Sequence, residues 1–394
     1  MSQTIIAAGF MPLTDSMLLV VAEQQGFAAA EGLSLRLVRE TSWANIRDRV
    51  GVGHFDVAHM LAPMPIAANL GLSPLPVPFI AAMALGHGGN AVTVSLDLWA
   101  QMIAHGATDD LDPATTGLAL AAAVHASPRR LRFGVVHQDS SHNHELRYWL
   151  AASGVVPDRD VEIVVLPPPL LPDALASGAI DGYCVGEPWG GVAVRAGHGR
   201  IVTTKSRIWR SSPDKVLGMR AAWADANPDT LAALIRALHN AALWCSAPAN
   251  LPEAARIMAQ PQFLDQPADL VGGALTGHLA IGAGATRQVE RFYVPYAGAA
   301  NFPWKSHAVW FYAQMVRWGQ VQASPQNLAL AAASFRPDLY RAALAPLGVP
   351  MPPDDYKIDG LITKPLELAT PAGPLLQFPD GFFDGTRFDW SAPL

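Results

Sequence analysis

Three histidines and one acid that could hold a metal ion lie in one short stretch: His137, His142, His144 and Glu145. Imidazole and carboxylate groups are common zinc ligands. The spacing is not that of an HExxH helix, in which two histidines four residues apart face one ion. We therefore expect no metal site. We interpret the histidines as capping or exposed residues, one of which donates a hydrogen bond to a ligand.

A second stretch, "DGYCVGEPWGG" (181–191), carries one thiol, one carboxylate and a stiff Pro-Trp pair among glycines. Small residues beside rigid ones indicate the wall of a cavity for a very small ligand. We expect Val185 and Gly186 to line it, because a residue without a Cβ permits close approach to the backbone. Glu187 is expected to hold backbone or an arginine away from the ligand, and Cys184 to be an inert small hydrophobic residue.

The composition excludes several classes of protein. The chain has 394 residues, of which 51% are hydrophobic and 15% charged, as in a compact globular protein with two or three domain-sized units. The net charge of −6 and the pI near 6.0 argue against a large nucleic-acid interface. Nucleophile-elbow, P-loop and dinucleotide motifs are absent, so we expect no enzyme and no catalytic residue. Two distant cysteines predict neither a disulfide framework nor structural zinc.

The first residues carry no targeting signal of the usual kind. After Met1 the chain continues "SQTIIAAGFMPLTDS", without a basic region, a long apolar region or a small-residue cleavage site. No apolar run reaches the roughly 18 residues of a membrane-spanning helix. These features predict a cytoplasmic protein that does not associate with membranes.

The hydrophobic pattern predicts elements that could position such a cavity. Thr4–Phe10 reads as a buried strand, and Thr14 or Asp15 as the cap of a helix through "MLLVVAEQQGF". Leu33–Arg39 alternates apolar and polar residues, as a strand packed on one face does. A strand, a helix and a strand in this order predict a βαβ unit.

The pattern repeats farther along the chain. Further predicted elements are a strand at 131–136, a helix at 143–154, a strand at 160–165 that prolines terminate, and a strand at 199–204 that returns to the first lobe. "GHGGN" (86–90) predicts a crossing between lobes. We expect an α/β protein of two lobes: residues 1–90 and 202–394 form lobe I with a helical C-terminal elaboration, and residues 91–201 form lobe II. Such an architecture places a ligand in the cleft between the lobes.

Several stretches together resemble the nitrate/bicarbonate-binding protein family. They extend from Gly9 to about Gly319 and include "GFMPLTDSMLLVVAEQQGF", "TSWANIRDRV", "DVAHMLAPMP", "LRYWLAASG", "DGYCVGEPW", "IWRSSPDKVLGMR" and "PWKSHAVWFYAQMVRWG". The resemblance implies a periplasmic-binding-protein-like type II fold, one oxyanion in the cleft, no cofactor and no catalysis. Because no leader is visible, the chain looks like the cytoplasmic nitrate/nitrite sensor branch. In that branch the protein sequesters an RNA-binding antiterminator of the ANTAR type until the anion binds.

The same resemblance implies the ligand-binding residues. Lys215 matches the lysine of the nitrate binders, where bicarbonate binders have a glutamate. His142 matches the family histidine before a lobe II helix, and Trp43 offers an indole N–H and a flat wall. Asn90 stands where the family has a glutamine amide, and Pro168 narrows the pocket.

These residues suit nitrate or nitrite, because a planar anion that only accepts hydrogen bonds needs donors and positive charge. Carboxylates near the ligand would oppose binding, so we expect none to point at it. The alternative reading is the substrate-binding subunit of a nitrate ABC transporter.

Overall fold

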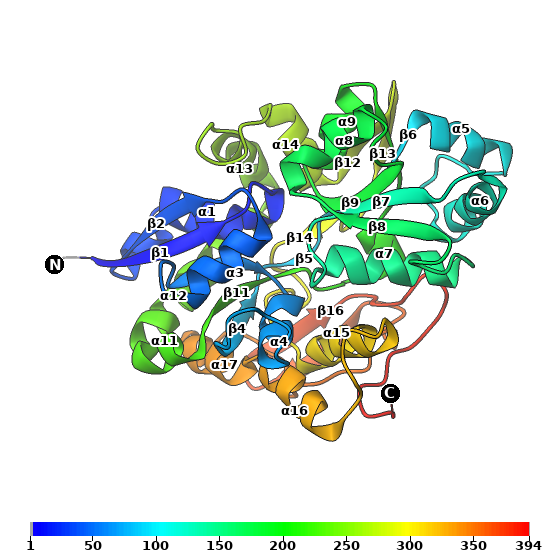
Figure 1. Cartoon of the computed structure of the whole chain (residues 1–394). Helices are drawn as coiled ribbons and strands as arrows, with labels where there is room; N and C mark the ends of the chain where they lie inside the picture. The colour runs from blue at the N-terminus through cyan, green and yellow to red at the C-terminus, as the bar shows by residue number, and fades with distance from the viewer. Residues whose placement is uncertain (1–2, 394) are drawn as a thin grey trace.

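The computed structural model describes residues 3–393, which form two α/β lobes around two five-stranded sheets (Figure 1). The first sheet has the order β2-β1-β3-β11-β4, with the bounds Leu33–Arg39, Thr4–Phe10, Val57–Leu61, Lys215–Arg220 and Phe79–Ala84. The second has the order β10-β6-β9-β7-β8, with the bounds Gly199–Thr204, Asn90–Ser95, Gly182–Gly186, Leu131–Val135 and Val161–Val165. The predicted two-lobed fold class is confirmed.

Both sheets mix parallel and antiparallel pairs. β1 lies parallel to β2 and β3, whereas β11 runs antiparallel between β3 and β4. In the second sheet β7 is parallel to β8 and β9, and β6 is antiparallel to β9. The predicted βαβ unit is therefore present. All five residues of β3 and the last five of β1 are buried, as expected of strands covered on both faces.

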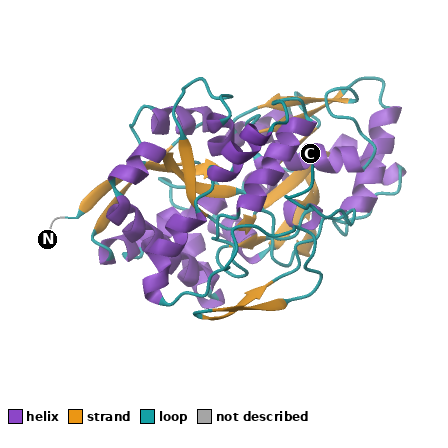
Figure 2. Cartoon of the chain, turned by 90° about the horizontal axis from the view of Figure 1, so that it is seen from below, coloured by secondary structure: helices purple, strands orange, loops and turns teal. Residues whose placement is uncertain are grey.

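Helices lie on both sides of the strands (Figure 2). They include α1 (Met17–Gln24), α3 (Trp43–Gly51), α7 (Ser141–Ala152), α9 (Trp189–Arg195) and α10 (Lys205–Ile208). The remaining α-helices are α2 (Phe27–Ala30), α4 (Pro63–Asn69), α5 (Leu96–Ala104), α6 (Pro113–Ala126), α8 (Leu171–Ala176), α11 (Ala221–Ala226), α12 (Pro228–Ser246), α13 (Leu251–Met258), α14 (Ala268–Thr276), α15 (Lys305–Arg317), α16 (Pro325–Ala333) and α17 (Pro337–Leu344). Three two-stranded antiparallel sheets complete the fold, with β5 (His87–Gly88) on β14 (Tyr293–Val294), β12 (His278–Gly282) on β13 (Ala285–Gln288), and β15 (Leu366–Thr370) on β16 (Gly373–Gln377).

One predicted strand placement is wrong. The strand at 199–204 was expected to return to the first lobe, but β10 pairs antiparallel with β6 at the edge of the second sheet. Its residues are fully buried against lobe II, so the crossing back to the first sheet occurs later, between β10 and β11. Sequence pattern identifies a buried strand, but it does not say which sheet edge that strand joins.

The C-terminal elaboration contacts both lobes. In it, α12 packs on α1 of lobe I, whereas α15 packs against α7 of lobe II. Phe382 stacks on Trp209, with ring centroids 4.7 Å apart, and Trp209 also contacts Trp310. This aromatic cluster fixes the C-terminal segment beside the second crossing between the lobes.

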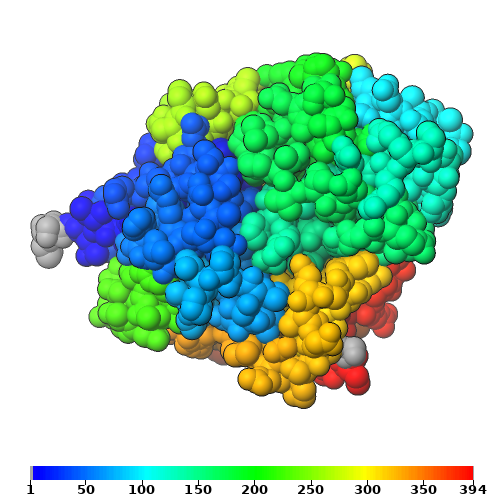
Figure 3. Space-filling view, in the orientation of Figure 1, coloured from blue at the N-terminus to red at the C-terminus, as the bar shows by residue number. Residues whose placement is uncertain are grey.

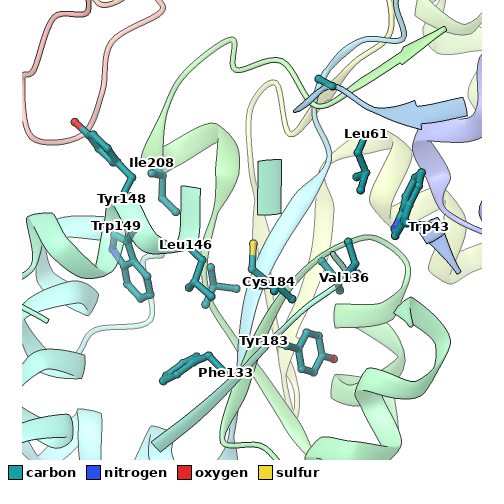
Figure 4. Close-up of a cluster of buried hydrophobic side chains, with 14 of the residues drawn as sticks. Trp43, Leu61, Phe133, Val136, Leu146, Tyr148, Trp149, Tyr183, Cys184 and Ile208 are labelled. Carbon is teal, nitrogen blue, oxygen red and sulfur yellow. The ribbon is translucent and has the colours of Figure 1, made fainter. Parts of the chain in front are cut away.

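The lobes are in contact along their facing surfaces. In the space-filling view, the blue residues of the first lobe meet the green residues of the second (Figure 3). Trp43 and Leu61 from the first lobe belong to the same buried apolar cluster as Val136 and Cys184 from the second (Figure 4). The structure therefore represents the closed arrangement of the two lobes.

Close packing in β11 leads to a stability prediction. A Cβ at Gly218 would lie 2.6 Å from Met60 Sδ and 2.8 Å from Met60 Cβ, too near for the neighbouring strand to accommodate. We expect Gly218→Ala to lower the free energy of unfolding by about 1–3 kcal/mol in chemical denaturation. Gly272→Ala in α14 is the matched control, because its Cβ would meet only Ala255 at 3.7 Å. The control should be neutral or up to about 1 kcal/mol more stable. Equal effects of the two changes would contradict this packing.

Candidate functional site

Lys215 lies at the meeting point of the lobes. It is the first residue of β11, opposite Leu61 of β3, and its side chain is fully buried. Its Nζ lies 2.9 Å from Asp15 Oδ2, 2.5 Å from Asp214 Oδ2 and 3.3 Å from His142 Nε2. An ammonium group has three N–H donors. All three are therefore used in this structure.

The charges of this cluster are held by mutual attraction. Burial alone lowers the pKa of Lys215, but Asp15 and Asp214 outweigh it and raise that pKa. Burial raises the pKa of Asp214, yet Lys205 and Lys215 hold it well below its usual range. A lysine charge buried without partners would be very costly, which explains why two carboxylates accompany this one.

His142 comes from the second lobe, as the second residue of α7, whose N-cap Ser140 accepts from the Asn143 N–H. Burial, followed by the nearby Lys215 charge, lowers the pKa of His142 to about 4, so its ring is neutral at pH 7. Since Lys215 donates to Nε2, the ring proton lies on Nδ1. Within residues 3–393, this buried Nδ1 has no hydrogen-bond partner. His142 therefore offers one free donor.

Trp43 provides another buried donor. It begins α3 directly after its N-cap Ser42, which accepts from the Asn45 N–H. Lys215 Nζ lies 5.5 Å from the centre of the Trp43 ring, a cation–π contact. Among the described residues nothing accepts a hydrogen bond from the buried indole Nε1.

Asn90 reaches the same point from β6. Asn90 pairs with Gly186 of β9, and a Cβ on Gly186 would lie 3.2 Å from Asn90 Oδ1 and 3.4 Å from Asp15 Oδ2. The amide therefore lies close to the carboxylate that contacts Lys215. Neither amide atom of Asn90 has a hydrogen-bond partner in the described part of the chain, although both are buried.

The structure thus brings together all four residues that were predicted to bind the ligand. Three of them, Trp43, Asn90 and His142, present buried polar atoms that are unpaired among residues 3–393. Buried polar groups normally have partners, and an unpaired one costs about 1–3 kcal/mol. A small hydrogen-bond acceptor bound among these residues, beside Lys215, would give their unpaired N–H groups a partner.

Of the three residues predicted to line the pocket, Gly186 and Val185 lie near Asn90, and the pocket role of Pro168 is not tested. Gly186 is next to Asn90 and Asp15, and Val185 is a buried β9 residue opposite Ala91 of β6. Pro168 begins the short 3-10 helix Pro168–Leu170 after β8 and is buried. Its place in the ligand pocket stays a prediction.

Sequence reasoning missed the acidic and basic partners of Lys215. We expected no carboxylate to point at the ligand, but Asp15 and Asp214 both contact the lysine. Ser141 Oγ donates to Asp214, whereas His59 Nε2 lies 2.9 Å from Asp15 Oδ1. Asp214 directly precedes Lys215 in "SSPDK", so the sequence alone could have indicated that this carboxylate lies near the lysine. No such indication existed for Asp15, 200 positions away.

A second buried contact between a lysine and carboxyl groups lies beside the first. Lys205 Nζ lies 2.8 Å from Glu145 Oε1 and 3.5 Å from Asp214 Oδ1, and it donates to the Pro213 carbonyl. Burial raises the pKa of Glu145 to about 8, although Lys205 opposes the shift. Because Lys205 lies in the crossing segment and Glu145 in α7, this pair fixes the crossing against lobe II.

The stretch at 181–191 joins the two lobes. The N–H and the hydroxyl of Thr14 both donate to the Glu187 carbonyl, at 2.8 and 3.1 Å. Trp189 Nε1 donates to the Pro12 carbonyl at 3.0 Å. We call these three hydrogen bonds the latch. The expected helix cap by Thr14 or Asp15 is therefore wrong, because both side chains are engaged elsewhere.

Other expectations for this stretch can be compared directly. The Glu187 carboxylate accepts from the Gly191 N–H at 2.9 Å, so the prediction that it holds backbone is confirmed. Burial raises the pKa of Glu187 to about 7 and also raises the pKa of the Cys184 thiol. A thiol with a raised pKa is a poor nucleophile at neutral pH.

The histidine stretch shows no metal-binding geometry. His137 Nδ1 accepts from the Asp139 N–H, and His144 lies against the Phe311 ring at 6.1 Å. Within residues 3–393 there is no group of three His, Cys, Asp or Glu that could hold a metal ion. Over the same range, no helix is long and apolar enough to cross a bilayer.

Known proteins resemble this chain over most of its length. Residues 2–259 match the NMT1-like family. The nitrate/nitrite binding protein NrtA of Synechococcus elongatus is 31% identical over 97% of this chain and 86% of its own length. The nitrate import ATP-binding protein NrtC of Synechocystis sp. is 34% identical over 91% of this chain, which spans only 53% of that relative.

Solved structures show the same architecture. The periplasmic nitrate-binding protein NrtA from Synechocystis PCC 6803 has a TM-score of 0.85 at 28% sequence identity, covering 98% of this chain and 96% of its own. The alkanesulfonate-binding protein SsuA from Xanthomonas axonopodis pv. citri has a TM-score of 0.59 at 15% identity, covering 85% and 99%. At that identity the second likeness shows the fold alone.

The latch predicts a measurable effect on lobe closure. Trp189→Phe keeps an aromatic ring but leaves the Pro12 carbonyl unpaired, which costs about 1–3 kcal/mol. The ratio of closed to open protein should fall by about 5- to 150-fold, seen as a larger radius of gyration in solution scattering.

Trp149→Phe is the matched control, because Trp149 Nε1 donates to Pro113 within lobe II. It should lower stability without changing the radius. An unchanged radius in Trp189→Phe, or the same increase in both variants, would show that the latch does not hold the lobes.

Proposed function

Because the chain belongs to the NMT1-like family and resembles NrtA over nearly its whole length, we propose that it is a solute-binding protein for nitrate or nitrite. The observation that supports this ligand most directly is that Trp43, Asn90 and His142, which lie around Lys215, each keep a buried polar atom without a hydrogen-bond partner among residues 3–393. Trp43 comes from α3 of the first lobe. Asn90 begins β6 of the second sheet, and His142 comes from α7 of the second lobe. A ligand at this point contacts both lobes.

The chemistry of the donors fits this choice. Nitrate and nitrite are planar, carry one negative charge and only accept hydrogen bonds. An indole N–H, an amide N–H and an imidazole N–H can each donate to one oxygen, and the Lys215 ammonium supplies charge. Charge-assisted hydrogen bonds contribute about 1.5–3 kcal/mol each. The ligand is held and released without a chemical step.

Closure of the lobes is the proposed output of binding. A ligand shifts the balance between open and closed forms only by its difference in affinity for the two. Donors on both lobes supply that difference, because the open form separates His142 from Trp43.

The role of the whole protein is proposed from its relatives. NrtA is named as a nitrate/nitrite binding protein, and NrtC as a nitrate import ATP-binding protein. These names favour a substrate-binding component of a nitrate importer over the sensor role expected from the sequence. The sensor, located in the cytoplasm and bound to an antiterminator of the ANTAR type, is retained as the second proposal.

A substitution at Lys215 tests the ligand assignment. Lys215→Glu should abolish the heat of nitrate binding in calorimetry, because it replaces the positive group with a like charge. Lys215→Gln, which removes charge alone, should weaken binding by about 10- to 150-fold. Lys364→Glu is the control, since Lys364 is exposed and remote from the cluster. Circular dichroism verifies folding. Unchanged affinity in folded Lys215→Gln would remove Lys215 from the site.

Gel filtration separates the two roles. If the sensor proposal holds, the protein should co-elute with the antiterminator, and nitrate, but neither chloride nor bicarbonate, should dissociate the complex. If the importer proposal holds, no such complex forms, and the protein should instead stimulate ATP hydrolysis by the reconstituted importer when nitrate is present. Co-elution that nitrate does not change would contradict the sensor proposal.

A further inference from the structure

Lys215 has no spare donor for an incoming anion. Its three N–H groups are directed to Asp15, Asp214 and His142, all within 3.3 Å. An anion that binds Lys215 must therefore replace one of these partners. Which partner yields follows from how each of them is held.

Asp214 and His142 are the less replaceable partners. Asp214 also accepts from the Ser141 hydroxyl, and its Oδ1 lies 3.5 Å from Lys205 Nζ. His142 is a neutral group, and its unpaired Nδ1 is itself a donor for the anion. Moving Asp214 would disturb two further partners, Lys205 and Ser141, whereas Asp15 has one further side-chain partner, His59. Asp15 is the partner that remains.

Asp15 places a negatively charged carboxylate, which only accepts hydrogen bonds, beside the proposed position of the anion. Its Oδ2, which contacts Lys215, lies 3.4 Å from the point where a Cβ on Gly186 would stand, beside the Asn90 amide. A carboxylate there competes with the anion for the same lysine. A carboxylic acid there would instead donate its O–H to the anion. One proton on Asp15 therefore changes this side chain from a group that competes with the anion into an additional hydrogen-bond donor to it.

The charge balance of the cluster also calls for a proton. Three carboxyl groups, those of Asp15, Asp214 and Glu145, contact the two buried lysines, Lys205 and Lys215. Because burial raises the pKa of Glu145 to about 8, Glu145 is mostly neutral at pH 7, and the charges of Asp15 and Asp214 balance those of the two lysines. A monovalent anion adds a negative charge that nothing in the cluster balances. Uptake of one proton restores neutrality where unbalanced charge is most costly.

We propose that Asp15 is a proton-linked competitor within the site, so that nitrate or nitrite binds together with one proton taken from solvent onto Asp15. The net step is the addition of one anion and one H⁺, with no covalent bond made or broken except the new O–H. This inference rests on the proposed function and adds to it a dependence of affinity on pH. It also assigns Asp15 a role in choosing ligands that accept hydrogen bonds.

The neighbouring groups favour protonation of Asp15 over His59. Met11 N donates to His59 Nδ1 at 3.4 Å, so the neutral ring carries its proton on Nε2, which faces Asp15 Oδ1. A further proton on His59 would break the bond to Met11. Asp15 Oδ2 has no such obstacle once Lys215 turns to the anion. Tyr293 is the remaining titratable group near Asp15, and its hydroxyl donates to the Leu85 carbonyl.

The direction of the pH effect follows from the ligand-free state. Burial raises the pKa of Asp15, but Lys215 and His59 outweigh it and hold that pKa below its usual range. The pKa of His59 is also below its usual value, in this case because of burial. Both groups are therefore without the extra proton at neutral pH. Affinity should fall about tenfold per pH unit above the pKa of the free form, until the pKa of the complex is reached.

Calorimetry in different buffers counts the protons. Nitrate is titrated into the full chain at pH 7.5 in phosphate and in Tris, whose ionisation enthalpies differ widely. The difference in binding enthalpy should correspond to about one proton taken up. Asp15→Asn should bind nitrate with no proton uptake and an affinity independent of pH. Asp97→Asn, at an exposed position on α5, is the matched control and should behave as the parent chain does.

His59→Asn adds a test of where the proton goes, because it keeps a donor but removes the ring. Uptake should persist in this variant. Uptake that disappears in His59→Asn but persists in Asp15→Asn would overturn the assignment to Asp15. Nitrate binding without proton uptake in the parent chain would overturn this inference and leave the proposed function intact. No binding of nitrate or nitrite in either buffer would overturn both.

Discussion

Burying the positive charge of Lys215 between two lobes is the constraint on which the site depends. A lysine at the first position of β11 lies where the first sheet meets α7 of the second lobe. The charge is tolerable only with counter-charges, and Asp15 and Asp214 supply them from the first lobe and the crossing segment. Ser141 donates to Asp214, and Lys205, which also lies beside Asp214, contacts Glu145 in turn.

The latch acts in the same region and links the site to closure. Thr14 is adjacent to Asp15, and its hydrogen bonds to Glu187 bring the first lobe against the end of β9. Gly186 precedes Glu187 and lies beside Asn90. Residues that join the lobes and residues of the proposed site thus lie next to each other on two short segments.

Much of the fold and part of the site could be predicted from the sequence. Thr4–Phe10 and Leu33–Arg39 form the strands that their hydrophobic patterns indicate, and family resemblance placed Trp43, Asn90, His142 and Lys215 in one region. Their role as ligand donors is still a prediction. The latch and the Asp15 contact could not be predicted, because they join residues more than 170 positions apart through side chains with equally good local uses. For Thr14 and Asp15 a helix cap was such a local use, and tertiary contacts outweighed it.

A crystal structure of the protein with nitrate bound would test the proposed anion site most directly. Nitrate should appear as planar density between the lobes, with oxygens within hydrogen-bond distance of Lys215 Nζ, Trp43 Nε1 and an N–H of the His142 ring, and Asp15 should no longer accept from Lys215. Nitrate bound elsewhere, with the contact between Lys215 and Asp15 unchanged, would contradict the proposed site.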